Sequence, residues 1–164
     1  MKSWNIEMKS KDEFCPKEPA PRGFEVHRVD PPCPDLNRLL HHLVGAPWKW
    51  GGRGGWGCDQ WAEYTANPAM ETWVAYLENI TAGYAELFTQ EDGSQRIMTF
   101  GLRQEFIGKG IGGCFLSAMV RRCWERGANR VWLNTCSNDH PHALKNYLAR
   151  GFTIFEEKVK PDAG

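Results

Sequence analysis

The chain has 164 residues, with 20 acidic and 20 basic side chains, so its formal net charge at pH 7 is zero. This length, with 41% hydrophobic residues, is sufficient to bury the core of one ordinary domain. The neutral balance argues against a general nucleic-acid binder. No apolar run approaches the roughly 20 residues that a membrane helix requires, and the N-terminus lacks the hydrophobic segment of a signal peptide. We therefore expect a cytoplasmic protein with neither nucleic acid nor membrane as a partner.

The first segment of the chain, residues 1–23, shows no sustained periodicity and becomes rich in proline. Such composition is typical of an extended or disordered lead-in. We therefore place residues 1–23 outside the fold and expect residues 24–164 to form a single domain.

Hydrophobic periodicity predicts the elements of this domain. A strand near residues 24–29 precedes a helix whose leucines recur at helical spacing, and a glycine-rich loop over residues 45–58 leads to a second, short helix. Three strand-like runs separated by turn residues follow, and they predict an antiparallel meander over residues 71–77, 82–88 and 95–102.

The second half of the domain continues with alternating helices and strands. We expect a helix over residues 110–126, a strand over 129–136, a helix from about residue 140 and a strand over 152–159. The order β-α-α-β-β-β-α-β-α-β predicts a mixed α/β (α+β) fold with a mostly antiparallel sheet flanked by helices.

Four glycines, Gly108, Gly110, Gly112 and Gly113, separate the third strand of the meander from the helix that follows it. Backbone N–H groups at such a helix start are unpaired and lie at the positive end of the helix dipole, so they can cradle a pyrophosphate. Lys109 can add a positive charge. A dinucleotide fold is disfavoured because antiparallel strands precede the glycines. The alternative is a tight turn that holds no ligand.

A second motif lies about 30 residues downstream, where Ala143, Tyr147, Gly151 and Phe152 form the pattern A-x-x-x-Y-x-x-x-G-F. Together with the glycines, this motif and its spacing resemble the GNAT superfamily of N-acetyltransferases over roughly residues 24–158. The resemblance implies a GNAT-like fold and an enzyme that uses acetyl-CoA as co-substrate. It also implies transfer of the acetyl group to a small-molecule primary amine, by direct attack of the amine on the thioester.

The resemblance further implies a set of cofactor-binding residues. The backbone of Leu102 would pair with the pantetheine arm, and His140 stands where the family often has an asparagine that touches this arm. The phosphates would be bound along Ile107, Gly108, Lys109, Gly110, Ile111, Gly112 and Gly113. Ile107 departs from the glutamine or arginine of the family pattern, but a backbone cradle does not require that side chain.

Tyr147 matches the family's tyrosine near the thioester sulfur, where its phenol can donate a proton to the departing thiolate. The alternative role for Tyr147 is core packing. The strand glutamate that serves many family members as the base is replaced here by Arg96. We expect Glu86 to act as the base, because a carboxylate beside aromatic residues has a raised pKa. The alternative for Glu86 is an ordinary strand glutamate facing solvent, and His140 is the other candidate base.

The acceptor side is expected around the glycine-rich loop. Trp48, Trp50, Trp56 and Tyr84 are candidate substrate-binding residues, with core filling as the alternative for the tryptophans. His41 and His42 have no spacing typical of a metal site, so we expect no metal. The short C-terminal stretch raises the possibility that a second copy of the chain, in a homodimer, completes the site. Two rival functions are a protein or peptide N-acyltransferase and a non-catalytic CoA-binding regulatory module.

Overall fold

The computed structural model describes residues 1–161, and the strands within this range form one seven-stranded sheet. In chain order the strands are β1 (Lys2–Met8), β2 (Phe24–Arg28), β3 (Met70–Leu77), β4 (Ile80–Thr89), β5 (Gln95–Leu102), β6 (Val131–Cys136) and β7 (Thr153–Val159). The α-helices are α1 (Pro34–Gly45), α2 (Cys58–Ala66), α3 (Gly112–Glu125) and α4 (Ala143–Ala149). Across the sheet the order is β2-β3-β4-β5-β6-β1-β7, and all neighbours are antiparallel except β5 and β6.

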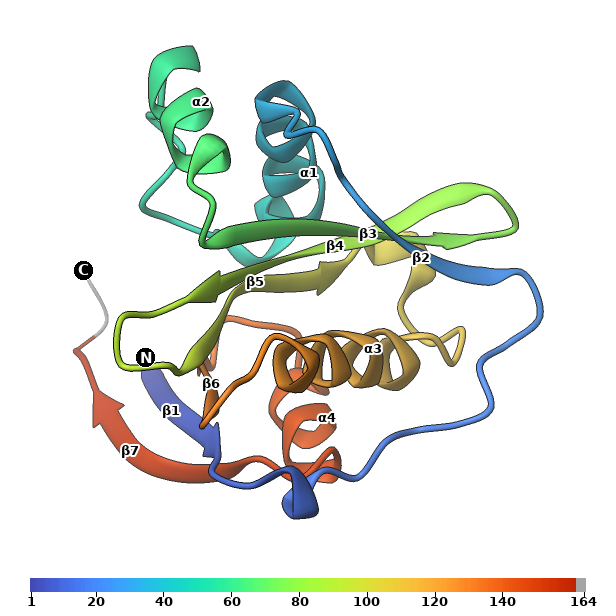
Figure 1. Cartoon of the computed structure of the whole chain (residues 1–164), viewed down its shortest axis with the longest axis vertical. Helices are drawn as coiled ribbons and strands as arrows, with labels where there is room; N and C mark the ends of the chain where they lie inside the picture. Colours follow the sequence, from blue (N-terminus) through green and yellow to red (C-terminus); the bar gives the residue numbers. More distant parts are fainter. Residues whose placement is uncertain (162–164) are drawn as a thin grey trace.

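Two helical layers cover the sheet (Figure 1). Helices α1 and α2 lie over one face of β3 and β4, while α3 and α4 lie on the other side. The apolar stripe of α1 packs Leu40 and Val44 against the sheet, and α3 buries Phe115 and Leu116 in the main core. From Phe24 onward the element order is the predicted one, and the mixed, mostly antiparallel fold is confirmed. Among residues 1–161, no helix is long and apolar enough to cross a membrane.

The expectation that residues 1–23 lie outside the fold is wrong for strand β1. This strand is inserted between β6 and β7, where Ile6 faces both Leu133 and Ile154, and the side chains of Ile6 and Met8 are fully buried. The alternation of Trp4, Ile6 and Met8 was a strand signal that the neighbouring polar residues obscured. The expected domain also includes residues 162–164, which lie outside the described residues.

The last strand is complete enough to pair along its length with β1, from Thr153 to Val159. The sequence raised a homodimer because the C-terminal stretch that forms this strand is short. That reason no longer applies, because β1 and β7 together extend the sheet beyond β6.

Strands β5 and β6 diverge after a short region of pairing. Their parallel register joins only Gln95 to Val131 and Arg96 to Trp132. Further along β5, a bulge at Met98 interrupts the register with β4, since Leu87 faces Ile97 and Glu86 faces Thr99. Bulges increase the local twist of a strand and commonly occur beside functional sites. The sheet is therefore open between the C-terminal parts of β5 and β6.

Candidate functional site

The glycine-rich turn after β5 exposes the start of α3. Gly108 and Gly110 adopt φ values of 86° and 80°, in the left-handed region that favours glycine. Helix α3 begins at Gly112, and the residue before it, Ile111, provides no side-chain cap. The first-turn N–H groups of α3 thus have no side-chain cap and lie at the positive end of the helix dipole, which is an arrangement suited to a phosphate.

A cavity of about 280 Å³ runs from this turn towards the sheet opening. The predicted cofactor-binding residues that line it are Leu102, Ile107, Gly108, Gly110, Gly112, Gly113 and His140. Two others do not line it, because the side chain of Lys109 is exposed and that of Ile111 is fully buried. His140 contacts the ring of Trp48 at a centroid distance of 5.2 Å, and burial together with His142 lowers its pKa. We call this space the glycine-turn cavity.

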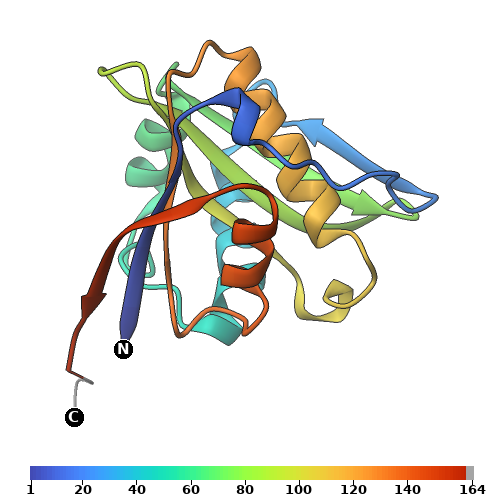
Figure 2. The same ribbon diagram turned by 90° about the horizontal axis from the view of Figure 1, so that it is seen from below.

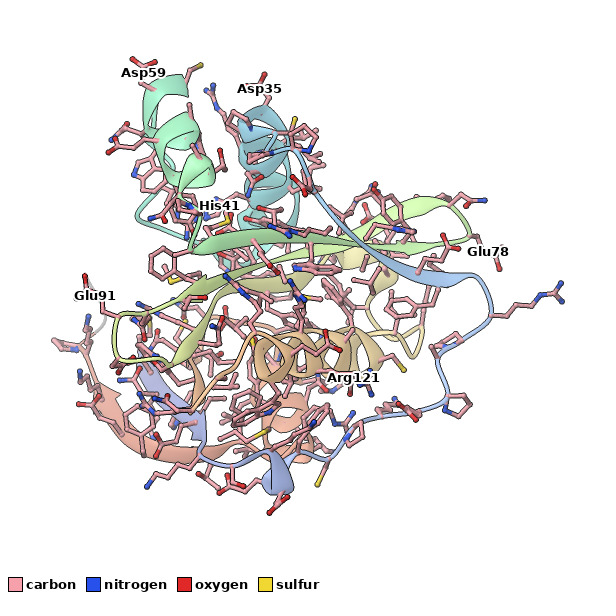
Figure 3. The ribbon with its side chains drawn as sticks, in the orientation of Figure 1. Asp35, His41, Asp59, Glu78, Glu91 and Arg121 are labelled. Atoms are coloured by element: carbon pink, nitrogen blue, oxygen red, sulfur yellow. The ribbon has the colours of Figure 1, made fainter. Side chains whose placement is uncertain are left out.

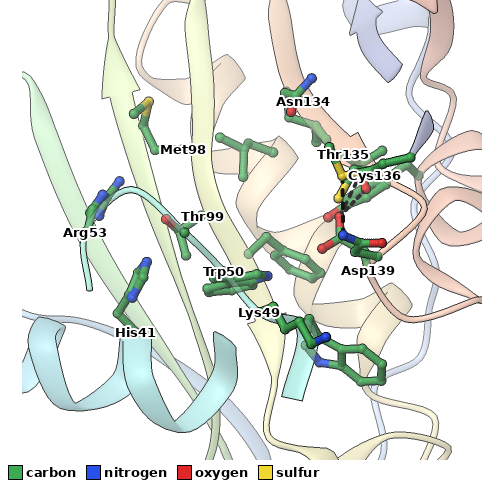
Figure 4. Close-up of a pocket in the computed structure, with 18 residues that line it drawn as sticks. His41, Lys49, Trp50, Arg53, Met98, Thr99, Asn134, Thr135, Cys136 and Asp139 are labelled. Atoms are coloured by element: carbon green, nitrogen blue, oxygen red, sulfur yellow. Dashed lines mark hydrogen bonds between the residues drawn. The ribbon is translucent and has the colours of Figure 1, made fainter. Parts of the chain in front are cut away.

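A second cavity, of about 400 Å³, lies on the other side of the opening between β5 and β6 (Figure 4). Five of the described residues line both cavities: Trp48, Trp50, Phe100, Asp139 and Tyr147. A long ligand that enters over the glycines can therefore present its end to the second cavity at these shared residues. We call the second space the acceptor cavity.

Tyr147 lies on the shared wall and is 6% exposed. Its ring packs edge-on against Phe100 and Phe152, so it also contributes to the core. Burial, and then the negative charge of Asp139, raise the pKa of Tyr147 well above that of a free phenol. The phenol is therefore protonated at neutral pH and has a proton to donate.

Asp139 is a residue of the shared wall that neither sequence motif indicated. Its Oδ2 accepts hydrogen bonds from Thr135 Oγ1 at 2.5 Å and from the backbone N–H of Cys136 at 3.1 Å, as Figure 4 shows. Asp139 is the single carboxylate among the described residues that line the two cavities. Its position directly before His140 was the available signal, because His140 was already placed near the cofactor arm.

Glu86 lies inside the structure rather than on either cavity. It is 0% exposed, and its Oε1 accepts hydrogen bonds from Arg53 Nη1 at 2.6 Å, Thr99 Oγ1 at 2.9 Å and Tyr64 at 3.0 Å. Asn37 Nδ2 donates to Oε2 at 3.0 Å. Arg53 and Thr99 line the acceptor cavity, whereas Glu86 does not. The geometry is that of a buried carboxylate paired with an arginine, and the solvent-facing alternative is wrong.

The predicted aromatic residues divide into three groups. Trp48 and Trp50 line both cavities. Trp56 packs against Trp61 and Tyr64, outside these two cavities. Tyr84 is fully buried between α1 and the sheet, so it does not reach the acceptor cavity.

His41 lies on the wall of the acceptor cavity, although no sequence pattern assigned it a functional role. It sits at the sheet end of α1, whereas Asp35 lies at the solvent end (Figure 3). Its ring contacts Trp50 and Trp61 and lines the acceptor cavity. Burial and the charge of Arg53 lower the pKa of His41, so its imidazole is neutral at pH 7. Among residues 1–161, no group of three or more His, Cys, Asp or Glu side chains is placed to hold a metal ion.

Comparison with known proteins identifies relatives of this fold. The model of the acetyltransferase (GNAT) family matches residues 38–152. A curated mycothiol acetyltransferase from Corynebacterium aurimucosum is 29% identical over 131 residues, which cover 75% of this chain and 37% of that protein.

Solved structures support the same architecture. A GCN5-related N-acetyltransferase from Sphaerobacter thermophilus matches with a TM-score of 0.73 at 16% identity, covering 95% of this chain and 49% of that one. An aminoglycoside acetyltransferase from an uncultured soil metagenomic sample was solved in complex with trehalose. It matches with a TM-score of 0.66 at 18% identity, covering 87% of this chain and 96% of that one.

These comparisons differ in what they cover. The chain spans less than half the length of the mycothiol acetyltransferase and of the Sphaerobacter protein. The two solved structures, at such low identity, show the fold alone. The family model instead covers more than half of the chain, and enzymes of that family are acyltransferases with acetyl-CoA as co-substrate. The chain therefore belongs to the GNAT family of acetyltransferases.

Proposed function

We propose that the protein is a cytoplasmic, acetyl-CoA-dependent N-acetyltransferase that transfers an acetyl group to a small-molecule primary amine. One observation carries this proposal: a cavity that begins at the glycine turn meets a second, polar cavity at Tyr147 and Asp139. Two substrates that enter from opposite sides can meet at these residues, as direct attack of the amine on the thioester requires.

The backbone provides most of the binding to acetyl-CoA in this proposal. The N–H groups of Gly112 and Gly113 hold the pyrophosphate at the start of α3. The pantetheine arm lies along β5, whose pairing with β6 ends at Arg96 and leaves the edge up to Leu102 available. When bound, acetyl-CoA supplies the activated acetyl group at the junction of the two cavities.

Two side chains transfer protons at the junction of the two cavities. We assign Asp139 as the proton acceptor for the ammonium form of the acceptor, because it is the carboxylate on the shared wall. Tyr147 gives its phenolic proton to the sulfur as the carbon–sulfur bond breaks, and the second proton that the nitrogen loses as the amide forms restores the phenol. Glu86 then acts as a positioning residue, because it holds Arg53 and through it the loop that carries Trp50.

The size and lining of the acceptor cavity favour a small molecule. About 400 Å³ is the volume of an ordinary small-ligand site. The names of two relatives, an aminoglycoside acetyltransferase and a mycothiol acetyltransferase, point to the same substrate class. A protein or peptide acceptor is the second candidate, but a groove for a basic peptide needs several carboxylates, and the described residues that line the cavity include one.

The test is a thiol-release assay with acetyl-CoA and a panel of amines that includes aminosugars, aminoglycosides and basic peptides. We expect release of free CoA with at least one small amine and none with the peptides. Release with the peptides alone would favour the protein acyltransferase. Binding of acetyl-CoA without thiol release across the panel would favour a non-catalytic CoA-binding module.

A further inference from the structure

The N-terminal segment between β1 and β2 is fastened across α3 and the end of α4, as Figure 2 shows for its path over α3. The N–H of Cys15 donates to the carbonyl of Arg150 at 2.9 Å, and the N–H of Lys17 donates to Ser117 Oγ at 2.8 Å. The Glu13 carbonyl lies where a side chain at residue 151 would be, so the glycine found there is required by this crossing. The segment is therefore part of the folded surface around α3.

This crossing brings two cations to the first turn of α3. A Cβ atom on Gly113 would lie 2.6 Å from Lys17 Cδ and would also collide with the guanidinium of Arg150. Lys17 and Arg150, together with Lys145, line a surface hollow of about 420 Å³. The hollow has no carboxylate on its wall, and within residues 1–161 none of these three cations forms an ion pair. We call these three residues the cation cluster.

The hollow is continuous with the glycine-turn cavity. Lys17, His142 and Asn146 line both spaces. In CoA, the ribose 3′-phosphate lies on the far side of the pyrophosphate from the pantetheine arm. A pyrophosphate at Gly113 therefore places the nucleotide end of CoA beside the cation cluster.

We propose that the cation cluster binds the 3′-phosphate of CoA, and that the N-terminal segment supplies one of its three charges through Lys17. The proposal rests on the proposed function, because it takes acetyl-CoA to be the ligand of the glycine turn. Charge-assisted contacts between lysine and phosphate are stronger than neutral hydrogen bonds and lose strength as salt rises. The cluster then distinguishes CoA from dephospho-CoA, which has no 3′-phosphate.

The test is calorimetric titration of the full chain with CoA and with dephospho-CoA. We expect the wild type to prefer CoA, and Lys17→Met and Lys145→Met each to weaken CoA binding by about fivefold to tenfold. Dephospho-CoA should bind Lys145→Met as it binds the wild type, because Lys145 lines the hollow and not the glycine-turn cavity, and Lys17→Met should weaken CoA more than dephospho-CoA. Lys11→Met is the matched control, because it removes one charge from the same N-terminal segment at an exposed site outside these cavities.

The outcomes separate this inference from the proposed function. Equal loss of affinity for both ligands, or no loss for either, overturns the 3′-phosphate assignment while the proposed function stands. A wild type that binds neither ligand contradicts the proposed function itself. Unchanged thermal unfolding of the variants establishes that a loss of affinity does not come from a loss of fold.

Discussion

Arg53 Nη1 lies 2.6 Å from Glu86 Oε1, and this ion pair joins the glycine-rich loop to the middle of the sheet. The two side chains are 12% and 0% exposed. Arg53 follows Trp48 and Trp50 in the same loop, and all three line the acceptor cavity. The pair therefore fixes one wall of the cavity from inside the protein.

Removal of Arg53 should be more damaging than removal of the whole pair. Arg53→Met leaves the carboxylate of Glu86 buried without its cation, and we expect a loss of about 3–5 kcal/mol in the free energy of unfolding. The double variant Arg53→Met/Glu86→Gln carries no buried charge and should recover part of this loss. Urea denaturation measures the free energy of unfolding of the single and the double variant. A loss below about 1 kcal/mol for Arg53→Met would contradict the structural importance of the pair.

Asp139 and Glu86 should give different kinetic defects. Asp139→Asn should lower kcat by about 100-fold or more, because the enzyme then has no base to take the proton from the amine substrate. Its rate should recover as pH rises, since free amine then forms in solution. Glu86→Gln should mainly raise KM for the amine, because it loosens the loop around Arg53. The reverse pattern, with kcat lost in Glu86→Gln alone, would return the role of base to Glu86.

Tyr147→Phe should lower kcat by about tenfold to 100-fold and leave the Kd of acetyl-CoA within about twofold. The variant keeps the ring that packs against Phe100 and Phe152 and removes only the hydroxyl. Because the pKa of Tyr147 is raised, the phenol keeps its proton at high pH, and the wild-type rate should not fall between pH 8 and about 10. An unchanged turnover in the variant would remove Tyr147 from the chemistry.

Acid stability should depend on Glu71, a buried carboxylate of β3. Burial alone would raise its pKa, but hydrogen bonds from Arg122 and Trp73 and the nearby charge of Arg126 lower the pKa to about 2. Because the pKa of Glu71 is lower in the folded state than in the unfolded state, its ionised carboxylate stabilises the fold at pH values above the unfolded-state pKa. This stabilisation is lost as pH falls towards 2. The shift corresponds to about 3 kcal/mol at neutral pH. Denaturation of the wild type and of Glu71→Gln between pH 6 and about 2 measures the free energy of unfolding. This free energy should depend less steeply on pH in the variant.

Much of the fold was predictable because its signals are local. The leucine spacing of α1, the meander of β3 to β5 and the glycines before α3 each occur within one short window. Strand β1 was missed because its pairing partners, β6 and β7, lie more than 120 residues away in the chain. Its polar residues, such as Asn5 and Glu7, hid the buried side of the strand.

The parts of the site that are marked by a local sequence motif could be predicted. The parts that depend on contacts between side chains distant in the chain could not. The glycine turn and the position of Tyr147 follow from the two motifs. The pairing of Glu86 with Arg53 joins residues 33 positions apart, and no local pattern indicates it. The approach of Lys17 to Gly113 likewise depends on how the N-terminal segment crosses α3.

The most direct measurement is calorimetric titration of the protein with acetyl-CoA, with two glutamate variants beside the wild type. Gly110→Glu places a carboxylate in the glycine turn, where the phosphates are expected. Gly127→Glu is its control, because Gly127 has a matching φ of 83° and open space around it at the other end of α3.

We expect the wild type and Gly127→Glu to bind acetyl-CoA with a Kd of roughly micromolar order, and Gly110→Glu to show no binding. Absence of binding by the wild type, or equal binding by the two variants, would contradict the account of the glycine turn as a phosphate site.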